Sequence, residues 1–178
     1  MLSLCSSLTR AASAPKPTSQ AFSRVEKQAK RWLFGEITVA KISTAGWTTQ
    51  EWLHFLKTVQ DGVSTTNGDV GVDSDRMAEL DRAFHLTRSG NSEIAFQWLS
   101  MSIRNRYEPA NQRLEEFLMT IGRRKFIKPL YEELAKTPEG KERALAIYRR
   151  ARPTYHPIAV TTIDDVLKWS VSRRGAAK

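Results

Sequence analysis

Apolar residues recur at steps of three and four along most of the chain, which is the spacing of one face of an α-helix. Short polar segments rich in glycine, proline, serine and threonine separate these apolar stripes. The pattern predicts a series of amphipathic helices, with a last short one at 162–167. The stripes are Phe22, Val25, Ala29 and Trp32; Trp52, Phe55, Leu56 and Val59; Met77, Leu80 and Phe84; Ile94, Trp98, Leu99 and Ile103; Leu114, Phe117, Leu118 and Ile121; Phe126, Leu130 and Leu134; and Ala144, Leu145 and Tyr148.

Several of the predicted helices have recognisable ends. Thr48 and Glu51 stand three residues apart and form a capping box, in which the two residues satisfy free backbone N–H groups of the first turn. Gly122 follows a helix that begins near Pro109, and glycine is favoured directly after a helix. Pro129 requires that the next helix begin only a few residues earlier, because proline is tolerated in a first turn.

Two segments are predicted to lie outside the helices. Residues 37–42 alternate weakly between apolar and polar, so we interpret them as a short extended stretch. Residues 61–74 contain mainly Asp, Gly, Ser, Thr and Asn, which indicates a mobile loop, an insertion or variable segment.

The succession of helices with short connections predicts an all-α fold. We expect seven to eight helices in antiparallel pairs, stacked as an α-α superhelix, that is, an armadillo- or HEAT-like solenoid. An irregular bundle of the same helices is the alternative. The chain divides into a disordered leader or linker at 1–17, a helical domain at 18–168 and a basic tail at 169–178.

Composition and charge narrow the choice of partners. The 178 residues, 40% of them hydrophobic, suffice for one globular domain with a core. The 28 basic and 19 acidic residues give a net charge of +9, which favours nucleic acid, anionic lipid or small carboxylates. The aromatic residues lie on apolar helix faces rather than between cations, so nucleic acid is the weaker choice. Because no run of about 18 apolar residues occurs, we expect no membrane span.

The first 25 residues bear on localisation. They contain Arg10, Lys16 and Arg24, have no acid and are rich in serine and alanine. This composition resembles a mitochondrial transit peptide, although the basic residues lack amphipathic spacing. We expect a cytoplasmic protein, with mitochondrial targeting as the alternative.

The residues that carry chemistry in known enzyme motifs are isolated in this sequence. His54, His85 and His156 form no H-E-x-x-H pair and fit no short zinc motif. We interpret His54 and His156 as packing, turn or surface residues. Cys5, the one cysteine, has no evident base beside it, and there is no G-x-S-x-G or phosphate loop. We therefore expect no cofactor in this chain and no catalysis by it alone.

The turn at 122–126 is the exception. Gly122 ends one predicted helix, and Arg123, Arg124 and Lys125 lead into the next. Free N–H groups at a helix start attract anions, and arginine can bind a carboxylate through two hydrogen bonds. The turn is therefore a candidate carboxylate or phosphate site. The alternative is that the cations are solvated or paired with the nearby acids Glu115, Glu116, Glu132 or Glu133.

An ordered set of short motifs resembles the C-terminal domain of leukotriene A4 hydrolase and related zinc aminopeptidases. The resemblance runs from about Pro15 to Leu167, and the segments 17–19, 31–32 and 47–55 look particularly like the bacterial members. No single motif is decisive, but the ordered set is specific. The motifs are Asn91-Ser92-Glu93-Ile94, Trp98-Leu99, Gly122-Arg123-Arg124-Lys125-Phe126, Lys128-Pro129-Leu130-Tyr131 and His156-Pro157.

The resemblance implies a helical solenoid that packs against a zinc-bearing catalytic domain and closes one side of the substrate tunnel. The family motif at the turn is Gly-Arg-x-Lys-Phe, whose Arg and Lys recognise the terminal carboxylate of a substrate. By position, these residues are Arg123 and Lys125, with Gly122 in the supporting turn. Arg124 stands where the family varies and receives no role. Zinc is expected only in the catalytic domain, which this sequence does not contain.

Two functions fit these observations. In the first, the chain is the C-terminal module of a zinc metallopeptidase, as a split-gene product, a truncated frame or a subunit that docks a separately encoded catalytic part. This reading predicts that one flank exposes apolar surface. In the second, the chain is a stand-alone solenoid that binds proteins or peptides.

Overall fold

The computed structural model describes residues 20–65 and 72–169. The predicted leader at 1–17, the basic tail beyond Trp169 and the middle of the predicted loop at 61–74 lie outside these ranges. Within them the chain forms eight α-helices and four 3₁₀ helices, and no strand. The α-helices are α1 (Gln20–Leu33), α2 (Thr49–Thr65), α3 (Ser74–Phe84), α4 (Ser92–Arg104), α5 (Asn111–Thr120), α6 (Arg124–Leu134), α7 (Pro138–Ala151) and α8 (Pro157–Leu167). The 3₁₀ helices are η1 (Val39–Lys41), η2 (Leu86–Arg88), η3 (Glu108–Ala110) and η4 (Arg152–Thr154).

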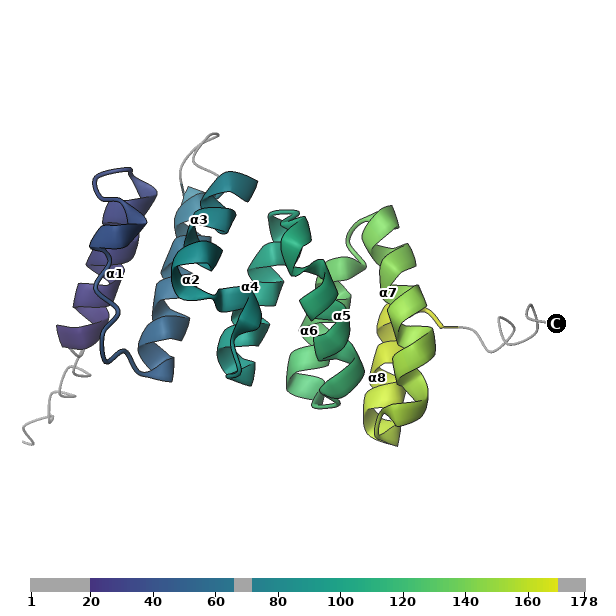
Figure 1. Ribbon diagram of the computed structural model, residues 1–178. Coiled ribbons are helices and arrows are strands. Elements are labelled where there is room, and N and C mark those ends of the chain that lie inside the picture. Colours follow the sequence, from purple (N-terminus) through teal and green to yellow (C-terminus); the bar gives the residue numbers. More distant parts are fainter. Residues whose placement is uncertain (1–19, 66–71, 170–178) are drawn as a thin grey trace, which may run out of the picture.

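The helices follow one another along the long axis of an elongated molecule, from α1 at one end to α7 and α8 at the other (Figure 1). Helices α2, α4, α6 and α8 pack side by side as one layer, although another helix separates each pair in the sequence. Helices α5 and α7 pack against each other in a second layer. The predicted α-solenoid is therefore confirmed.

One hydrophobic core runs through all eight helices, from Val25 to Leu167. Its largest fully buried side chains include Trp32, Trp98 and Tyr131. Each predicted apolar stripe contributes to this core, which confirms the helical spacing. The capping box is also present, since the Thr48 amide donates to Glu51 Oε2 at 2.8 Å and the Glu51 amide donates to Thr48 Oγ1 at 3.3 Å.

Residues 37–42 do not form one extended stretch, which corrects the prediction from their weak alternation: Thr38 and Ile42 have extended backbone angles, but residues 39–41 between them are helical. They contain the 3₁₀ helix η1, closed by hydrogen bonds from the Lys41 and Ile42 amides to the carbonyls of Thr38 and Val39. The Val39 amide also donates to Glu79 Oε1 of α3 at 3.3 Å. A carboxylate distant in the sequence thus fixes this turn, and local alternation carries no sign of it.

The start of the predicted loop at 61–74 is helical instead, because α2 continues to Thr65. Gly62 lies where α2 packs against α1, and a β-carbon there would come within 2.6 Å of Leu33 Cδ1. Lys57 and Asp61 form an i,i+4 ion pair on the exposed side. Packing against α1 therefore overrides the loop propensity of the polar residues.

Two further helix boundaries differ from prediction. Helix α6 begins at Arg124, so Pro129 lies inside it rather than in its first turn. Proline there removes the bond that its N–H would have given to the Lys125 carbonyl. The last helix begins at Pro157, earlier than the predicted 162, with His156 as N-cap. Proline at the first helical position favours a helix start, and it explains why this helix begins at the segment interpreted above as a turn.

Candidate functional site

The candidate carboxylate turn is the junction between α5 and α6. Helix α5 ends with the Ile121 amide bonded to the Phe117 carbonyl at 2.8 Å, so Gly122 directly follows the cap as predicted. Its backbone is not in the left-handed conformation that usually explains glycine at this position, since Gly35 and Gly46 are the glycines with positive φ in the described ranges. A β-carbon at Gly122 would meet only Tyr155 Cδ1, at 4.0 Å. The turn therefore does not require glycine for conformation.

Helix α6 begins without a side-chain cap. Arg123 is its extended N-cap residue, and the first turn contains no acid. The amides of Phe126 and Ile127 both donate to the Arg123 carbonyl, at 2.9 and 3.2 Å. The amides of Arg124 and Lys125 have no partner among the described residues. These two free N–H groups and the helix dipole make the start of α6 locally electropositive.

The three cations of the turn point to two different places. The guanidinium carbon of Arg123 and Nζ of Lys125 lie 5.7 and 4.5 Å from the ring centroid of Phe126. Phe126 is buried, and its ring contacts Phe96 and Phe117 in the core. The side chains of Arg123 and Lys125 therefore both lie over the same buried ring, in contacts of the cation–π type.

Arg124 instead lines a separate hollow of about 460 Å³ between α6 and α8. The other side chains around that hollow include Lys128 and Asp165. The side chain of Arg124 therefore belongs to a different surface from those of Arg123 and Lys125.

Lys125 forms an ion pair with Glu93, in the first turn of α4. This pairing was not anticipated, because 32 residues separate the two in the sequence. The acids proposed as partners are paired elsewhere: Arg150 with Glu115, Arg113 with Glu116, Lys128 with Glu132, and Arg104 and Lys136 with Glu133. Arg123 has no ion pair within 20–65 and 72–169. One of the two candidate cations is thus open and the other partly covered.

The three histidines lie apart from one another in the structure. His54 stacks on Phe22 with ring centroids 5.1 Å apart, and its Nε2 lies 3.7 Å from Glu26 Oε2. His85 and His156 lie at the ends of α3 and α8. In the described part of the chain, no group of three or more His, Cys, Asp or Glu side chains is arranged to hold a metal ion.

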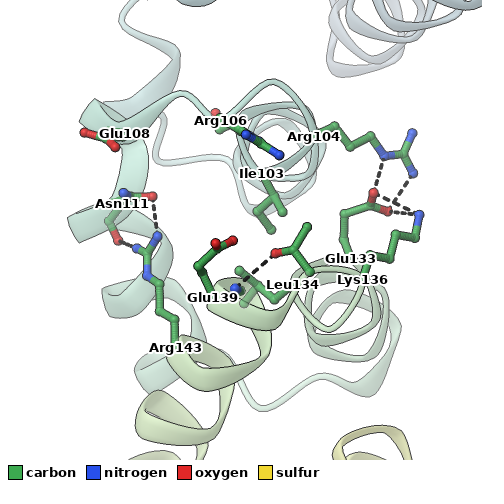
Figure 2. A pocket seen from close by; sticks show the side chains of 13 residues that line it. Ile103, Arg104, Arg106, Glu108, Asn111, Glu133, Leu134, Lys136, Glu139 and Arg143 are labelled. Carbon is green, nitrogen blue, oxygen red and sulfur yellow. Dashed lines mark hydrogen bonds and ion pairs between the residues drawn. The ribbon is translucent and has the colours of Figure 1, made fainter.

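A polar groove of about 560 Å³ lies at the other end of α6, and no motif in the sequence indicates it. Figure 2 shows Arg104 and Lys136 directed at Glu133 on one side and Arg143 directed at Asn111 on the other. Although burial raises the pKa of Glu133, hydrogen bonds from Lys136 and Arg104 hold that pKa below its usual value. Arg104 and Arg143 are thus already engaged by internal partners. Their contacts connect α4 with α6 and α5 with α7.

Large apolar side chains are seldom exposed in residues 20–65 and 72–169. Phe34 and Ile158 are the large hydrophobic residues exposed in the described ranges. Phe34 directly follows α1 and Ile158 belongs to α8, so they lie at opposite ends of the molecule (Figure 1). No helix in the described part is long and apolar enough to cross a membrane.

Two layers of stacked helices define an α-solenoid domain. Residues 47–167 match the family described as "Leukotriene A4 hydrolase, C-terminal". The chain therefore belongs to this family.

Several fungal proteins are similar in sequence. The chain is 29% identical over 139 residues to leucine aminopeptidase 2 of Neurospora crassa, covering 78% of this chain and 20% of that protein. It is 28% identical over 130 residues to leucine aminopeptidase 2 of Pyricularia oryzae, covering 73% of this chain and 20% of that protein. It is 34% identical over 83 residues to leucine aminopeptidase 2 of Candida glabrata, covering 47% of this chain and 12% of that protein.

Among solved structures, native yeast LTA4 hydrolase superposes with a TM-score of 0.73 at 20% sequence identity. The match covers 91% of this chain and 28% of that structure. It supports the helical fold of the chain. The matched regions make up 12% to 28% of the length of these larger proteins.

Proposed function

We propose that this chain is the helical module of a zinc aminopeptidase-type enzyme, and that it packs against a catalytic domain and binds the substrate's terminal carboxylate through Arg123 and Lys125. The catalytic domain belongs to a longer protein or to a separate subunit. The family membership supports the first part of the proposal, and the three fungal relatives described above are leucine aminopeptidases several times longer than this chain.

The observation that carries the carboxylate proposal is the shared position of Arg123 and Lys125 beside the Phe126 ring. Two cations of different geometry next to free helix N–H groups suit a carboxylate, because arginine can donate two parallel hydrogen bonds and lysine adds a compact charge. The separate position of Arg124 agrees with a role for Arg123 and Lys125 only.

In the proposed assembly, zinc is bound by the catalytic domain, where it would polarise the scissile carbonyl and activate a water molecule. The residues of this chain would hold the far end of the substrate and thereby fix its position. We expect the chain alone to hydrolyse no leucyl peptide with zinc supplied, and measurable turnover by the purified chain would contradict this.

The carboxylate proposal is tested by titrating the whole chain with an N-acetylated tripeptide that carries either a free or an amidated C-terminus, followed by NMR. We expect tighter binding of the free acid and shifts at the amides of residues 124–126. Arg123→Gln should weaken this binding at least about tenfold, since a charge-assisted hydrogen bond contributes about 1.5–3 kcal/mol. Arg124→Gln is the matched control and should leave it unchanged. Equal affinity of the acid and the amide would refute the carboxylate site.

A further inference from the structure

Glu93 supplies a carboxylate to Lys125 within the chain itself. Glu93 and Lys125 each belong to the first turn of a helix, and α4 and α6 are neighbours in the same layer. The Glu93 carboxylate therefore reaches the lysine ammonium from the adjoining helix. It makes the kind of contact with Lys125 that the carboxylate of a bound ligand would make.

The contact is of a kind that a ligand can replace. The side chains of Lys125 and Glu93 are 48% and 40% exposed, and exposed ion pairs are weak. Glu93 also lines a hollow of about 330 Å³ between α2 and α4, together with Gln50 and Gln97. A displaced Glu93 carboxylate thus has space and polar neighbours beside it, while Arg123 has no acid partner in the described ranges.

We propose that Glu93 is an internal competitor that occupies Lys125 until a ligand carboxylate replaces it. This inference rests on the proposed carboxylate site. In the free chain, Arg123 is open to the ligand first, and Lys125 joins after it exchanges Glu93 for the ligand. Glu93 thereby lowers the affinity of the site and restores the pair with Lys125 when the ligand leaves.

Glu93→Gln tests the competition in the same NMR titration with the free and amidated tripeptides. Because exposed pairs contribute about 0.2–1 kcal/mol, loss of the competitor should tighten binding of the free acid about two- to fivefold. Binding of the amide should stay unchanged. Glu132→Gln is the control, since it removes the same charge from a pair of similar exposure, Lys128–Glu132, away from the turn.

A double substitution shows whether Glu93 acts through Lys125. In a Lys125→Gln background, Glu93→Gln should give no further gain. If the unaltered chain prefers the free acid but Glu93→Gln leaves its affinity equal or weaker, the competition is refuted and the carboxylate site stands. If neither the unaltered chain nor Glu93→Gln distinguishes acid from amide, the carboxylate site and the competition both fall.

Discussion

The two ends of α6 are built in opposite ways. At its start, the turn around Gly122 has no side-chain cap and leaves Arg123 exposed beside an aromatic ring. At its end, the chain turns into α7 with Thr137 as a hydrogen-bonded cap, and Glu133 holds Arg104 and Lys136 together (Figure 2). At the end of the helix, Glu133, Arg104 and Lys136 are engaged with one another, whereas Arg123 at its start has no ion pair among the described residues.

This difference separates structural charge from charge that is available to a ligand. Both ends are rich in cations, so composition alone does not distinguish them. At the end of α6, Arg104, Lys136 and Arg143 each donate to an internal acceptor and lose part of their capacity to bind anything else. At its start, free N–H groups and an unpaired guanidinium remain, which is the condition for anion binding. The predictions below probe this contrast.

The largest effect is expected from Gly140→Ala at the closed end. A β-carbon at Gly140 would lie closer to the Leu134 carbonyl oxygen than any real contact allows, and 2.7 Å from Thr137 Oγ1. The backbone would have to move, which should lower the free energy of unfolding by about 1–3 kcal/mol despite the better helix propensity of alanine. Urea denaturation measures this change.

Gly122→Ala at the open end is the matched control. Its β-carbon would meet only Tyr155, at an ordinary contact distance, and the backbone there is not left-handed. We expect a change within about 0.5 kcal/mol or a slight stabilisation. Equal destabilisation by the two alanine substitutions would contradict the difference between the two junctions.

An intermediate effect is expected from Glu133→Gln. Its carboxylate joins Arg104 and Lys136 from two sides and is largely buried, with 10% of the side chain exposed. Removing the charge leaves both cations without their acidic partner. The free energy of unfolding at neutral pH should therefore fall by about 1 kcal/mol. Thermal or urea unfolding of the variant measures the loss.

The stability difference between the parent chain and Glu133→Gln should depend on pH. Because hydrogen bonds hold the pKa of Glu133 below its unfolded value of 4.5, the carboxylate stabilises the fold above that pH. Its contribution is lost as the pH falls through the lower pKa of the folded state. The difference between the parent chain and Glu133→Gln should therefore shrink as the solution is acidified from neutral pH to below 4. A constant difference over this range would show that Glu133 acts by packing alone.

Much of the fold was readable from the sequence, because burial follows the helical spacing. The stripes through Trp98 and Phe117 and the capping box at Thr48 are local patterns with local causes, and the structure contains them. The predictions for residues 37–42 and for the start of 61–74 were wrong because contacts with residues distant in the sequence determine the backbone conformation there. Glu79 accepts a hydrogen bond from the Val39 amide within the turn at residues 38–42, and Leu33 packs over Gly62 inside a segment composed like a loop.

The candidate site was only partly readable. The spacing of residues 122–126 indicated a helix start with cations, and the family resemblance selected Arg123 and Lys125. The convergence on Phe126 and the pairing with Glu93 depend on how α4 lies beside α6. A run of three cations carries no information about which side chain points where, because neighbouring helical residues face different directions. The groove around Glu133 was missed for the same reason, as its lining comes from four helices and their connections.

The smallest change in stability is expected from Arg123→Gln at the start of α6. Arg123→Gln removes an exposed guanidinium whose one described contact is with the Phe126 ring at 5.7 Å, so stability should change by no more than about 0.5 kcal/mol. Arg104→Gln makes the same substitution at the other end of α6, where the side chain is ion-paired with Glu133, and should be the more destabilising. Urea unfolding of both variants decides the matter. If Arg123→Gln costs at least as much as Arg104→Gln, the charge at the open end is structural, and its availability to a ligand loses its physical basis.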